Sequence, residues 1–436
     1  MRKLAVFCLL CFVSVVVMMI ILYGQQKGYL PNDQVVMSTE SRTTDQPQFY
    51  FELKNITSFI QKRDKLMFLK THKCGTSSLV TILYQFGIRR NLNFLLTPYE
   101  HQFFNDKPPQ KLAPGQDYDI LCQHHRGSGA WDYYRPWIIH KLLPKEQTFY
   151  FTILRNPNQQ FLSNYFFYNH QDRLKKKFQI KSDSVDEVLQ QSLALLPNDT
   201  LTCNSFINPM SFDLGFTHFL QKNKGLNPDV LIVSFIRYLD REFDLIMITN
   251  EFDKSLLLLK HYLGWRIDDV VYLKKMTRSL DDSAEPIKPV VSENTLKLLT
   301  FHNRVDMKVF EYFEQKFTAQ IETLEEKQFE ADLETLQEKQ TDLVSQCLDM
   351  SHVIKTHLGT VYHPLSNTGR MSNSCRLWTL SDVFISKSLA AKQDPTFSED
   401  SFKAMMLKNV KYGTIVSHLK LLEGIRSDYL RSSGTS

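Results

Sequence analysis

The sequence has 436 residues, of which 43% are hydrophobic and 23% charged, and its formal net charge is +5. This composition is ordinary for a globular protein, and the length allows one to three domains. The small net charge and the lack of a dense Lys/Arg block argue against a nucleic-acid-binding protein, so no nucleic-acid partner is expected.

The N-terminus carries an apolar stretch, residues 4–23, without a charged side chain. A stretch of this length can cross a bilayer once. Only Arg2 and Lys3 precede it. Because positive charge stays cytosolic, residues 1–3 are expected to form a cytosolic tail and the remainder to face the lumen. A cleaved signal peptide is the alternative, but residues 15–22 offer no small-residue cleavage site, which favours a signal-anchor.

Residues 24–64 form a polar segment with two glycines and Pro31. Such a segment buries little apolar surface, so we expect a flexible lumenal stem. Glycosylation sequons begin at Asn55 and Asn198, which agrees with a lumenal location.

Seven cysteines occur in the sequence, and five of them lie beyond the apolar stretch. These five are Cys74, Cys122, Cys203, Cys347 and Cys375. In an oxidising lumen they can form disulfides, and because five is odd, at least one is free or pairs between chains. No CxxC pair occurs among them, so no metal site is expected. A homodimer is left open.

Strand-like and helix-like runs alternate from residue 65 onward. Strands are predicted at 66–69, 118–122, 147–154, 230–235 and 245–249, and helices at 79–86, 159–168 and 254–263. This alternation predicts an α/β fold with a central, mostly parallel sheet flanked by helices. In such sheets ligands bind beyond the carboxyl ends of the strands.

The chain becomes helical and rich in charge at residues 291–347. Residues 319–340 pair acids and bases at helical spacing beside a partial apolar stripe. This pattern favours a solvated helix with one buried face over a coiled coil. No period is evident after Ser351, so we expect one domain at 65–350 and a C-terminal extension at 351–436, whose packing on that domain is left open.

The loop after the first predicted strand reads Lys70-Thr-His-Lys-Cys-Gly-Thr-Ser-Ser78. A strand, a loop rich in N–H and hydroxyl groups, and a helix N-terminus together form an anion site. Lys73 adds a positive charge and Gly75 lets the backbone approach a ligand closely. The further candidate ligands are Lys70, Thr71, Thr76, Ser77 and Ser78. The GxxxxGK[ST] pattern of nucleotide P-loops is missing, and a simple capped helix is an equal alternative.

Arg155 ends the strand predicted at 147–154, and Ser163 lies in the helix that follows. An arginine at a strand end with a serine nearby suits a terminal phosphate, because the guanidinium donates two parallel hydrogen bonds. A structural arginine that pairs with a carboxylate is the alternative.

Three histidines are candidates for a general base. His124 and His125 follow the strand predicted at 118–122, and His72 lies inside the first loop. Histidine suits proton removal from a hydroxyl, since its unperturbed pKa is about 6.5. Metal binding and ordinary loop histidines are the alternatives for His124 and His125, and we favour these two as base over His72.

The stretches LKTHKCGTSS at 69–78 and ILRNPNQQFLSNYFF at 153–167 resemble the two donor-binding motifs of the galactose-3-O-sulfotransferase family of Golgi enzymes. Residues 208–216 and 268–272 are similar to the NP…FDLGF and DDVVY stretches of the same family. The likeness covers residues 66–317 in family order. It departs from the family pattern at Cys74 and Thr76, where the family has threonine and serine.

The resemblance implies a single P-loop-like sulfotransferase domain whose donor is 3′-phosphoadenosine 5′-phosphosulfate (PAPS), with no metal. Lys73 and its loop would hold the 5′-phosphosulfate. Arg155 and Ser163 would hold the 3′-phosphate. A histidine near the acceptor would remove the hydroxyl proton.

The resemblance also implies an acceptor and a location. The acceptor is a terminal β-galactose of a glycolipid or glycoprotein, sulfated at the 3-hydroxyl by a single-pass type II Golgi membrane protein. Alternatives are a sulfotransferase for another sugar, such as the 2-O-uronosyl type, and an inactive membrane-anchored glycan-binding relative. A P-loop kinase is disfavoured by the missing nucleotide motif.

Overall fold

The computed structural model describes part of the chain: residues 64–97, 102–104, 111–126, 136–199, 201–274, 277–278, 291–355, 360–393 and 424–428, with Pro109 and Leu421. All of these belong to one compact unit of the chain, residues 51–436. The predicted cytosolic tail, the signal-anchor at 4–23 and Asn55 lie outside the described residues. No helix in the described part of the chain combines the length and the apolarity needed to cross a membrane.

Four parallel strands form the central sheet in the order β3–β1–β5–β6. They are β1 (Leu66–Leu69), β3 (Ile120–Leu121), β5 (Phe149–Leu154) and β6 (Leu245–Ile248). Every residue of these strands is buried, as expected for a parallel sheet covered on both faces. The chain order reverses between β1 and β5, and a ligand crevice is expected at the carboxyl ends of these two strands.

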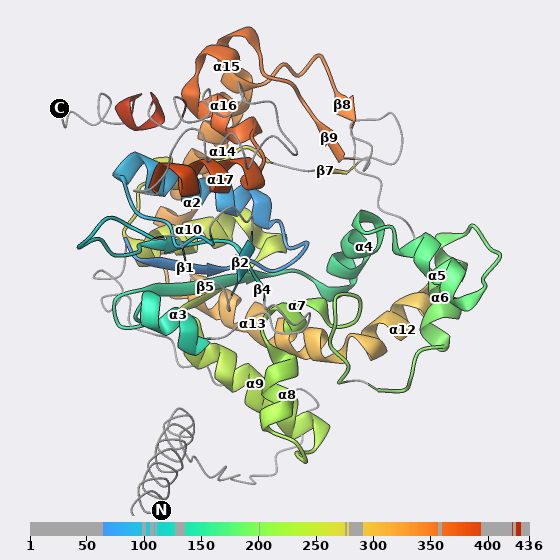
Figure 1. Ribbon diagram of the computed structural model, residues 1–436. Coiled ribbons are helices and arrows are strands. Elements are labelled where there is room, and N and C mark those ends of the chain that lie inside the picture. Colours follow the sequence, from blue (N-terminus) through green and yellow to red (C-terminus); the bar gives the residue numbers. More distant parts are fainter. Residues whose placement is uncertain are drawn as a thin grey trace, which may run out of the picture. The chain divides into compact units, whose positions relative to one another are not determined.

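Helices cover both faces of this sheet (Figure 1). One face carries α2 (Thr76–Arg90), α10 (Phe252–Leu263), α14 (Glu326–Cys347) and α17 (Asp382–Gln393). The other face carries α3 (Pro136–Leu142), α9 (Pro228–Glu242) and α13 (Arg304–Glu322). The predicted α/β architecture with a parallel sheet between helices is therefore confirmed.

A group of helices beside the sheet builds a second hydrophobic core (Figure 1). These helices are α4 (Pro157–Phe167), α5 (His170–Phe178), α6 (Val185–Ala194) and α12 (Glu293–His302). Buried Phe161 and Tyr165 of α4 pack there, so the helix that follows β5 is anchored along one side. Four further short helical elements are α7 (Pro209–Asp213), α8 (Phe216–Lys222), the 3₁₀ turn η2 (Thr249–Glu251) and α11 (Ile267–Val270).

Two small sheets accompany the main one. Strand β2 (Gln102–Phe104) pairs in parallel with β4 (His124–Arg126). Strands β7 (Thr277–Arg278), β9 (Thr360–Tyr362) and β8 (Ile354–Lys355) form an antiparallel group. The second group joins the chain before α12 to the chain after α14.

The strand predicted at residues 230–235 is wrong, because these residues lie inside helix α9. The side chain of Asn227 accepts a hydrogen bond from the Asp229 N–H, and Pro228 occupies the first turn, so a helix start precedes the apolar run. A six-residue window of β-formers is too short to show the helical period. That period is clear in the buried set Leu231, Ile232, Phe235, Ile236 and Leu239.

Residues 319–340 are divided between two helices, since α13 ends at Glu322 and α14 begins at Glu326. Leu336 is buried while most of α14 faces solvent. The expected helical structure with one buried face is present, but a turn between Glu322 and Glu326 divides it into two helices.

Helix structure continues after Ser351, where the sequence showed no period: α15 (Asn367–Met371), α16 (Asn373–Thr379) and α17. At the end of α17 the Gln393 side chain donates to the Phe94 carbonyl at 2.9 Å and accepts from the Phe94 N–H at 2.8 Å. Phe94 bridges to Ile120 of β3. The C-terminal part of the chain thus covers the β3 edge of the sheet.

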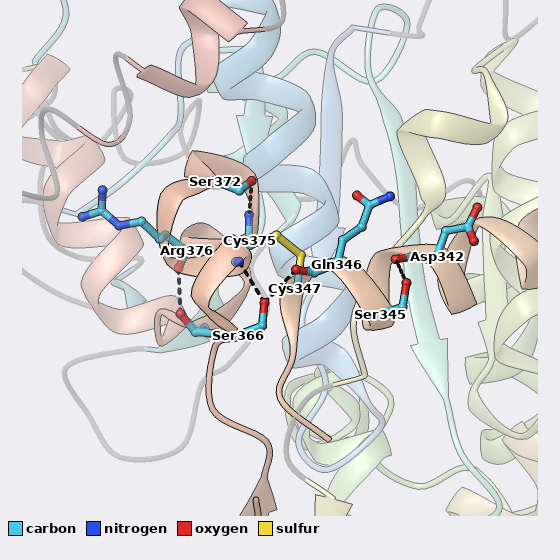
Figure 2. Close-up of a disulfide and its surroundings, with 10 residues drawn as sticks. Asp342, Ser345, Gln346, Cys347, Ser366, Ser372, Cys375 and Arg376 are labelled. Atoms are coloured by element: carbon cyan, nitrogen blue, oxygen red, sulfur yellow. Dashed lines mark hydrogen bonds between the residues drawn. A yellow bond between two sulfur atoms is a disulfide. The ribbon is translucent and has the colours of Figure 1, made fainter. Parts of the chain in front are cut away.

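A disulfide between Cys347 and Cys375 joins the end of α14 to α16 (Figure 2). Beside it, Ser366 donates its N–H to the Cys347 carbonyl at 3.0 Å and its hydroxyl to the Gln346 carbonyl at 2.8 Å. Gly369 approaches so closely that a Cβ there would lie 2.2 Å from the Cys347 carbonyl oxygen. The corner between α14, α15 and α16 is therefore fixed by a covalent bond, hydrogen bonds and close backbone packing.

Candidate functional site

The loop between β1 and α2 lies at the carboxyl end of β1, where the sheet order predicts a crevice. Two of its residues have left-handed backbones, Lys73 with φ 62° and Gly75 with φ 71°. Glycine adopts this conformation freely, whereas a lysine in it is strained. The surroundings must therefore hold Lys73 in place.

Three consecutive carbonyl groups of this loop accept hydrogen bonds from side chains of other elements. The pairs are Gln160 Nε2 to His72 O at 2.9 Å, Arg155 Nη1 to Lys73 O at 3.2 Å, and Thr249 Oγ1 to Cys74 O at 2.8 Å. The donors belong to α4, to the end of β5 and to the turn after β6. The loop is thus fixed by the residues that follow the neighbouring strands.

The two predicted donor-binding motifs meet at this point. Arg155 follows β5 directly, and its guanidinium touches the Lys73 carbonyl. The Lys73 ammonium lies 3.7 Å from the ring centroid of Phe167, the last residue of α4. Ser163 is partly exposed and lies one helical turn before Phe167, so both belong to the same face of α4. The structure therefore brings Lys73, Arg155 and the Ser163 face of α4 together.

The charges at this point suit an anion. Burial lowers the pKa of Arg155, because desolvation disfavours the charged guanidinium. An anion beside it would favour the charged form again. Helix α2 directs its N-terminus toward the loop and has no acidic residue in its first turn. These features fit the phosphate and sulfate groups of a donor such as PAPS.

The other predicted ligands of the loop bond mainly to the protein itself. Thr71 Oγ1 donates to Ile153 O at 2.6 Å, Thr76 Oγ1 to Thr71 O at 3.4 Å, and Ser78 Oγ to Leu273 O at 3.5 Å. The Lys70 ammonium forms an ion pair with Asp382 of α17 and is 8% exposed. Ser77 is partly exposed. A direct role of these residues in donor binding stays a prediction.

His72 contacts the buried carboxylate of Asp213, in α7, through both its backbone and its ring. Its N–H donates to Asp213 Oδ2 at 2.6 Å, and its Nδ1 lies 2.8 Å from Asp213 Oδ1. Its ring stacks on that of His124, with centroids 3.9 Å apart and planes at 17°. The His124 Nδ1 in turn lies 2.9 Å from the Lys70 carbonyl. Two of the three candidate bases therefore lie together at the donor loop.

The environments of His124 and His125 disfavour proton uptake. Burial lowers the pKa of His124 well below its usual range, and the nearby His72 and Lys70 add to this effect. Burial alone lowers the pKa of His125 to about 3, and its side chain is 2% exposed. A base in contact with an acceptor needs access and a pKa nearer to neutral. The roles predicted for these two residues stay predictions, which the geometry does not favour.

Cys74, which departs from the family pattern, is a buried thiol whose Sγ lies 3.4 Å from the His72 carbonyl. Burial raises its pKa to about 12, so it remains protonated at neutral pH. It therefore acts as a small packing residue and weak donor. Cys74, Cys122 and Cys203 are the free thiols in the described part of the chain.

Sequence reasoning missed several residues that build this site. Asp213 and Asp306 hold His72 and α7, Gln160 and Thr249 hold the loop carbonyls, and Asp382 pairs with Lys70. Asp213 lies in the stretch 208–216 noted for its family likeness, and that was a usable signal. Gln160 likewise lies in the noted stretch 153–167. Thr249, Asp306 and Asp382 lie far away in sequence, and no local pattern marks them.

Comparison with known proteins shows the family to which the sequence is similar. A model of the family described as galactose-3-O-sulfotransferase matches residues 1–363. Human galactosylceramide sulfotransferase is 27% identical over 299 residues, covering 67% of this chain and 66% of that protein. Galactose-3-O-sulfotransferase 2 of Sus scrofa is 30% identical over 271 residues, covering 59% of this chain and 62% of that protein. The chain thus spans slightly less than two thirds of these relatives, and Asp382 lies beyond the family match.

Proposed function

The chain belongs to the galactose-3-O-sulfotransferase family, and on that premise we propose that it transfers a sulfuryl group from PAPS to the 3-hydroxyl of a terminal β-galactose. The acceptor is a glycolipid or glycoprotein glycan. The protein acts as a type II membrane protein of the Golgi, with its domain in the lumen. No metal takes part.

The observation that supports this proposal best is the meeting of Arg155 with the Lys73 loop. The guanidinium and the Lys73 carbonyl are 3.2 Å apart although the residues are separated by 82 positions in the chain. PAPS carries a 3′-phosphate and a 5′-phosphosulfate on one nucleoside, so its site needs two cationic groups close together. The two motifs supply them at the switch point of a parallel sheet.

Each side chain then has a distinct role. Lys73 leaves Phe167 to contact the bridging oxygen and neutralise the charge that grows there as the sulfuryl group departs. The N–H groups at Gly75 and Ser77 face the phosphosulfate at the start of α2. Arg155 and Ser163 bind the 3′-phosphate. Positioning and charge neutralisation account for most of the rate, as in phosphoryl transfer.

A second group of residues in the loop has a structural role. Lys70, Thr71, Thr76 and Ser78 are buried and bonded to the protein, so they keep the loop in shape around the donor. A histidine of the site takes the proton from the acceptor hydroxyl. The identity of the sugar beneath the galactose is left to experiment.

Turnover with labelled PAPS tests the proposal. Lys73→Ala should lose at least about 100-fold in kcat, since one electrostatic contact in a transition state has this weight. Arg155→Ala should raise KM for PAPS more than KM for the sugar. Lys297→Ala is the matched control, because Lys297 is exposed and pairs with Glu293 on α12. Wild-type rates in Lys73→Ala would contradict the proposed role of this lysine.

An acceptor panel separates the alternatives. It contains galactosylceramide, lactosides, N-acetyllactosamine, the core disaccharide of mucin-type glycans, and heparan fragments. Transfer to galactosides supports the proposal, and transfer to heparan fragments alone indicates a 2-O-uronosyl type enzyme. Binding of adenosine 3′,5′-bisphosphate without transfer to any acceptor indicates an inactive glycan-binding relative.

A further inference from the structure

We propose that Asp213 is a positioning residue that sets the tautomer and orientation of His72, and that His72 is the base that removes the acceptor proton. This inference rests on the proposed function. It selects one of the three candidate histidines, and it adds a carboxylate that sequence motifs alone do not assign to the reaction.

Asp213 contacts His72 at two points, the backbone N–H and the ring. Asp213 Oδ2 accepts the His72 N–H at 2.6 Å, and Asp213 Oδ1 lies 2.8 Å from the ring Nδ1. An ionised carboxylate only accepts hydrogen bonds, so the neutral ring must carry its proton on Nδ1. The lone pair is then on Nε2, which is the nitrogen that can take a proton.

His72 is also the candidate base that is best placed to reach an acceptor. The His72 side chain is 23% exposed and precedes Lys73 directly, whereas its partner Asp213 is 5% exposed. The ring of His124 stacks on His72 and limits its rotation. His125 is almost fully buried, so an acceptor sugar reaches His72 more easily than His125. Among the three candidate histidines, all of them in the described part of the chain, His72 is the one that combines partial exposure at the donor loop with a contact to a buried carboxylate.

Asp213 is itself held in place by the packing of α7. It ends α7, whose first N–H groups at Met210 and Ser211 donate to the two carboxylate oxygens of Asp306 at 3.0 and 2.7 Å. Asn208, which precedes α7, accepts the Asp306 N–H at 3.0 Å. These contacts fix α7 and therefore the carboxylate that α7 presents to His72. Residues that hold a base in place in this way are a general feature of acid–base sites.

Sulfuryl transfer and proton removal take place together in the proposed step. The acceptor hydroxyl oxygen forms a bond to sulfur while the bond from sulfur to the bridging oxygen breaks, and that electron pair stays on the 5′-phosphate. His72 Nε2 takes the hydroxyl proton. Asp213 keeps its negative charge and stabilises the resulting imidazolium, which later releases the proton to water.

The test uses Asp213→Asn in the full chain. An asparagine that accepts the His72 N–H with its oxygen places its NH₂ group against Nδ1, which must then accept, so the ring proton moves to Nε2. The expected result is a kcat lower by about 10²- to 10⁴-fold with KM for PAPS changed by less than about threefold. Asp213→Glu keeps a carboxylate and should recover part of kcat. Asp229→Asn is the control, because Asp229 forms an exposed ion pair with Arg304 on the surface.

Two further readouts separate positioning from a general structural role. Nitrogen-15 NMR of the histidine side chains should show an Nδ1–H tautomer for His72 in the wild type and an Nε2–H tautomer in Asp213→Asn. The His72→Ala variant assigns the signal. The double variant His72→Ala, Asp213→Asn should have the same kcat as His72→Ala alone, because both changes remove the same step.

Each outcome is decisive. An unchanged tautomer, or losses that add in the double variant, would overturn the positioning role of Asp213. Wild-type turnover in His72→Ala would overturn the base assignment while transfer from PAPS stands. A wild-type chain that neither binds adenosine 3′,5′-bisphosphate nor transfers sulfate would overturn the proposed function, and this inference with it.

Discussion

The ion pair between Lys70 and Asp382 connects the donor loop to α17 and should contribute measurably to stability. The Lys70 side chain is 8% exposed and that of Asp382 25%. Removing one partner of a buried pair costs about 3–5 kcal/mol, because the other charge stays buried and uncompensated. Water reaches Asp382 in part, so Asp382→Asn should lower the free energy of unfolding by about 2–3 kcal/mol.

Urea unfolding of the full chain, followed by circular dichroism, measures this free energy. Lys70→Met in the Asp382→Asn background removes the stranded charge and should recover most of the loss. The matched control is Asp268→Asn, whose partner Lys339 lies 2.9 Å away with side chains 56% and 43% exposed. That pair should contribute less than about 1 kcal/mol. If Asp382→Asn costs no more than the control, or Lys70→Met adds to the loss, the buried-pair reasoning fails.

Three further changes address the disulfide, a buried histidine and a close backbone contact. Reduction of the disulfide, or the double variant Cys347→Ser, Cys375→Ser, should lower the free energy of unfolding by about 3–4 kcal/mol, as expected for a loop closed over 28 residues. Urea titration with and without reductant checks this, and equal unfolding midpoints would contradict it. His125 has a pKa lowered to about 3 by burial, so its contribution to stability is present above pH 6.5 and is lost as pH falls toward 3. When the pH falls from 7.5 to 5.5, the free energy of unfolding of His125→Phe should therefore decrease by about 1 kcal/mol less than that of the wild type. Parallel plots of unfolding free energy against pH for the two proteins would refute this. Gly369→Ala should lower the free energy of unfolding by about 1–3 kcal/mol, because the added Cβ would lie 2.2 Å from the Cys347 carbonyl oxygen. An unchanged melting temperature would contradict this close contact.

The sheet was predictable because its strands are short, mostly apolar runs. β1 and β5 are buried at every residue, and such runs between turn signals indicate a covered parallel strand. The same rule failed at residues 230–235, where an apolar run on one face of a helix resembles a strand when the window is short. Burial alone does not distinguish the two, and the Asn-Pro start of α9 carries the missing information.

The cationic part of the site was predictable for a different reason. Arg155 directly follows β5 and Lys73 lies in the loop after β1, so a parallel sheet places both at one edge whatever the remaining packing. The residues that orient them were not predictable. Thr249 and Asp382 reach the loop from positions more than 170 residues away, and a single sequence contains no periodicity that links such positions.

The absent P-loop glycines also have a physical explanation. A non-glycine residue in the left-handed region costs about 1 kcal/mol or more, and Lys73 is such a residue. Hydrogen bonds contribute about 1 kcal/mol each, and side chains from three other elements bond the carbonyls of residues 72, 73 and 74. Tertiary contacts therefore impose the conformation that glycine would otherwise allow. Because the strained residue is itself the lysine, the same contacts that fix the backbone also aim the cation.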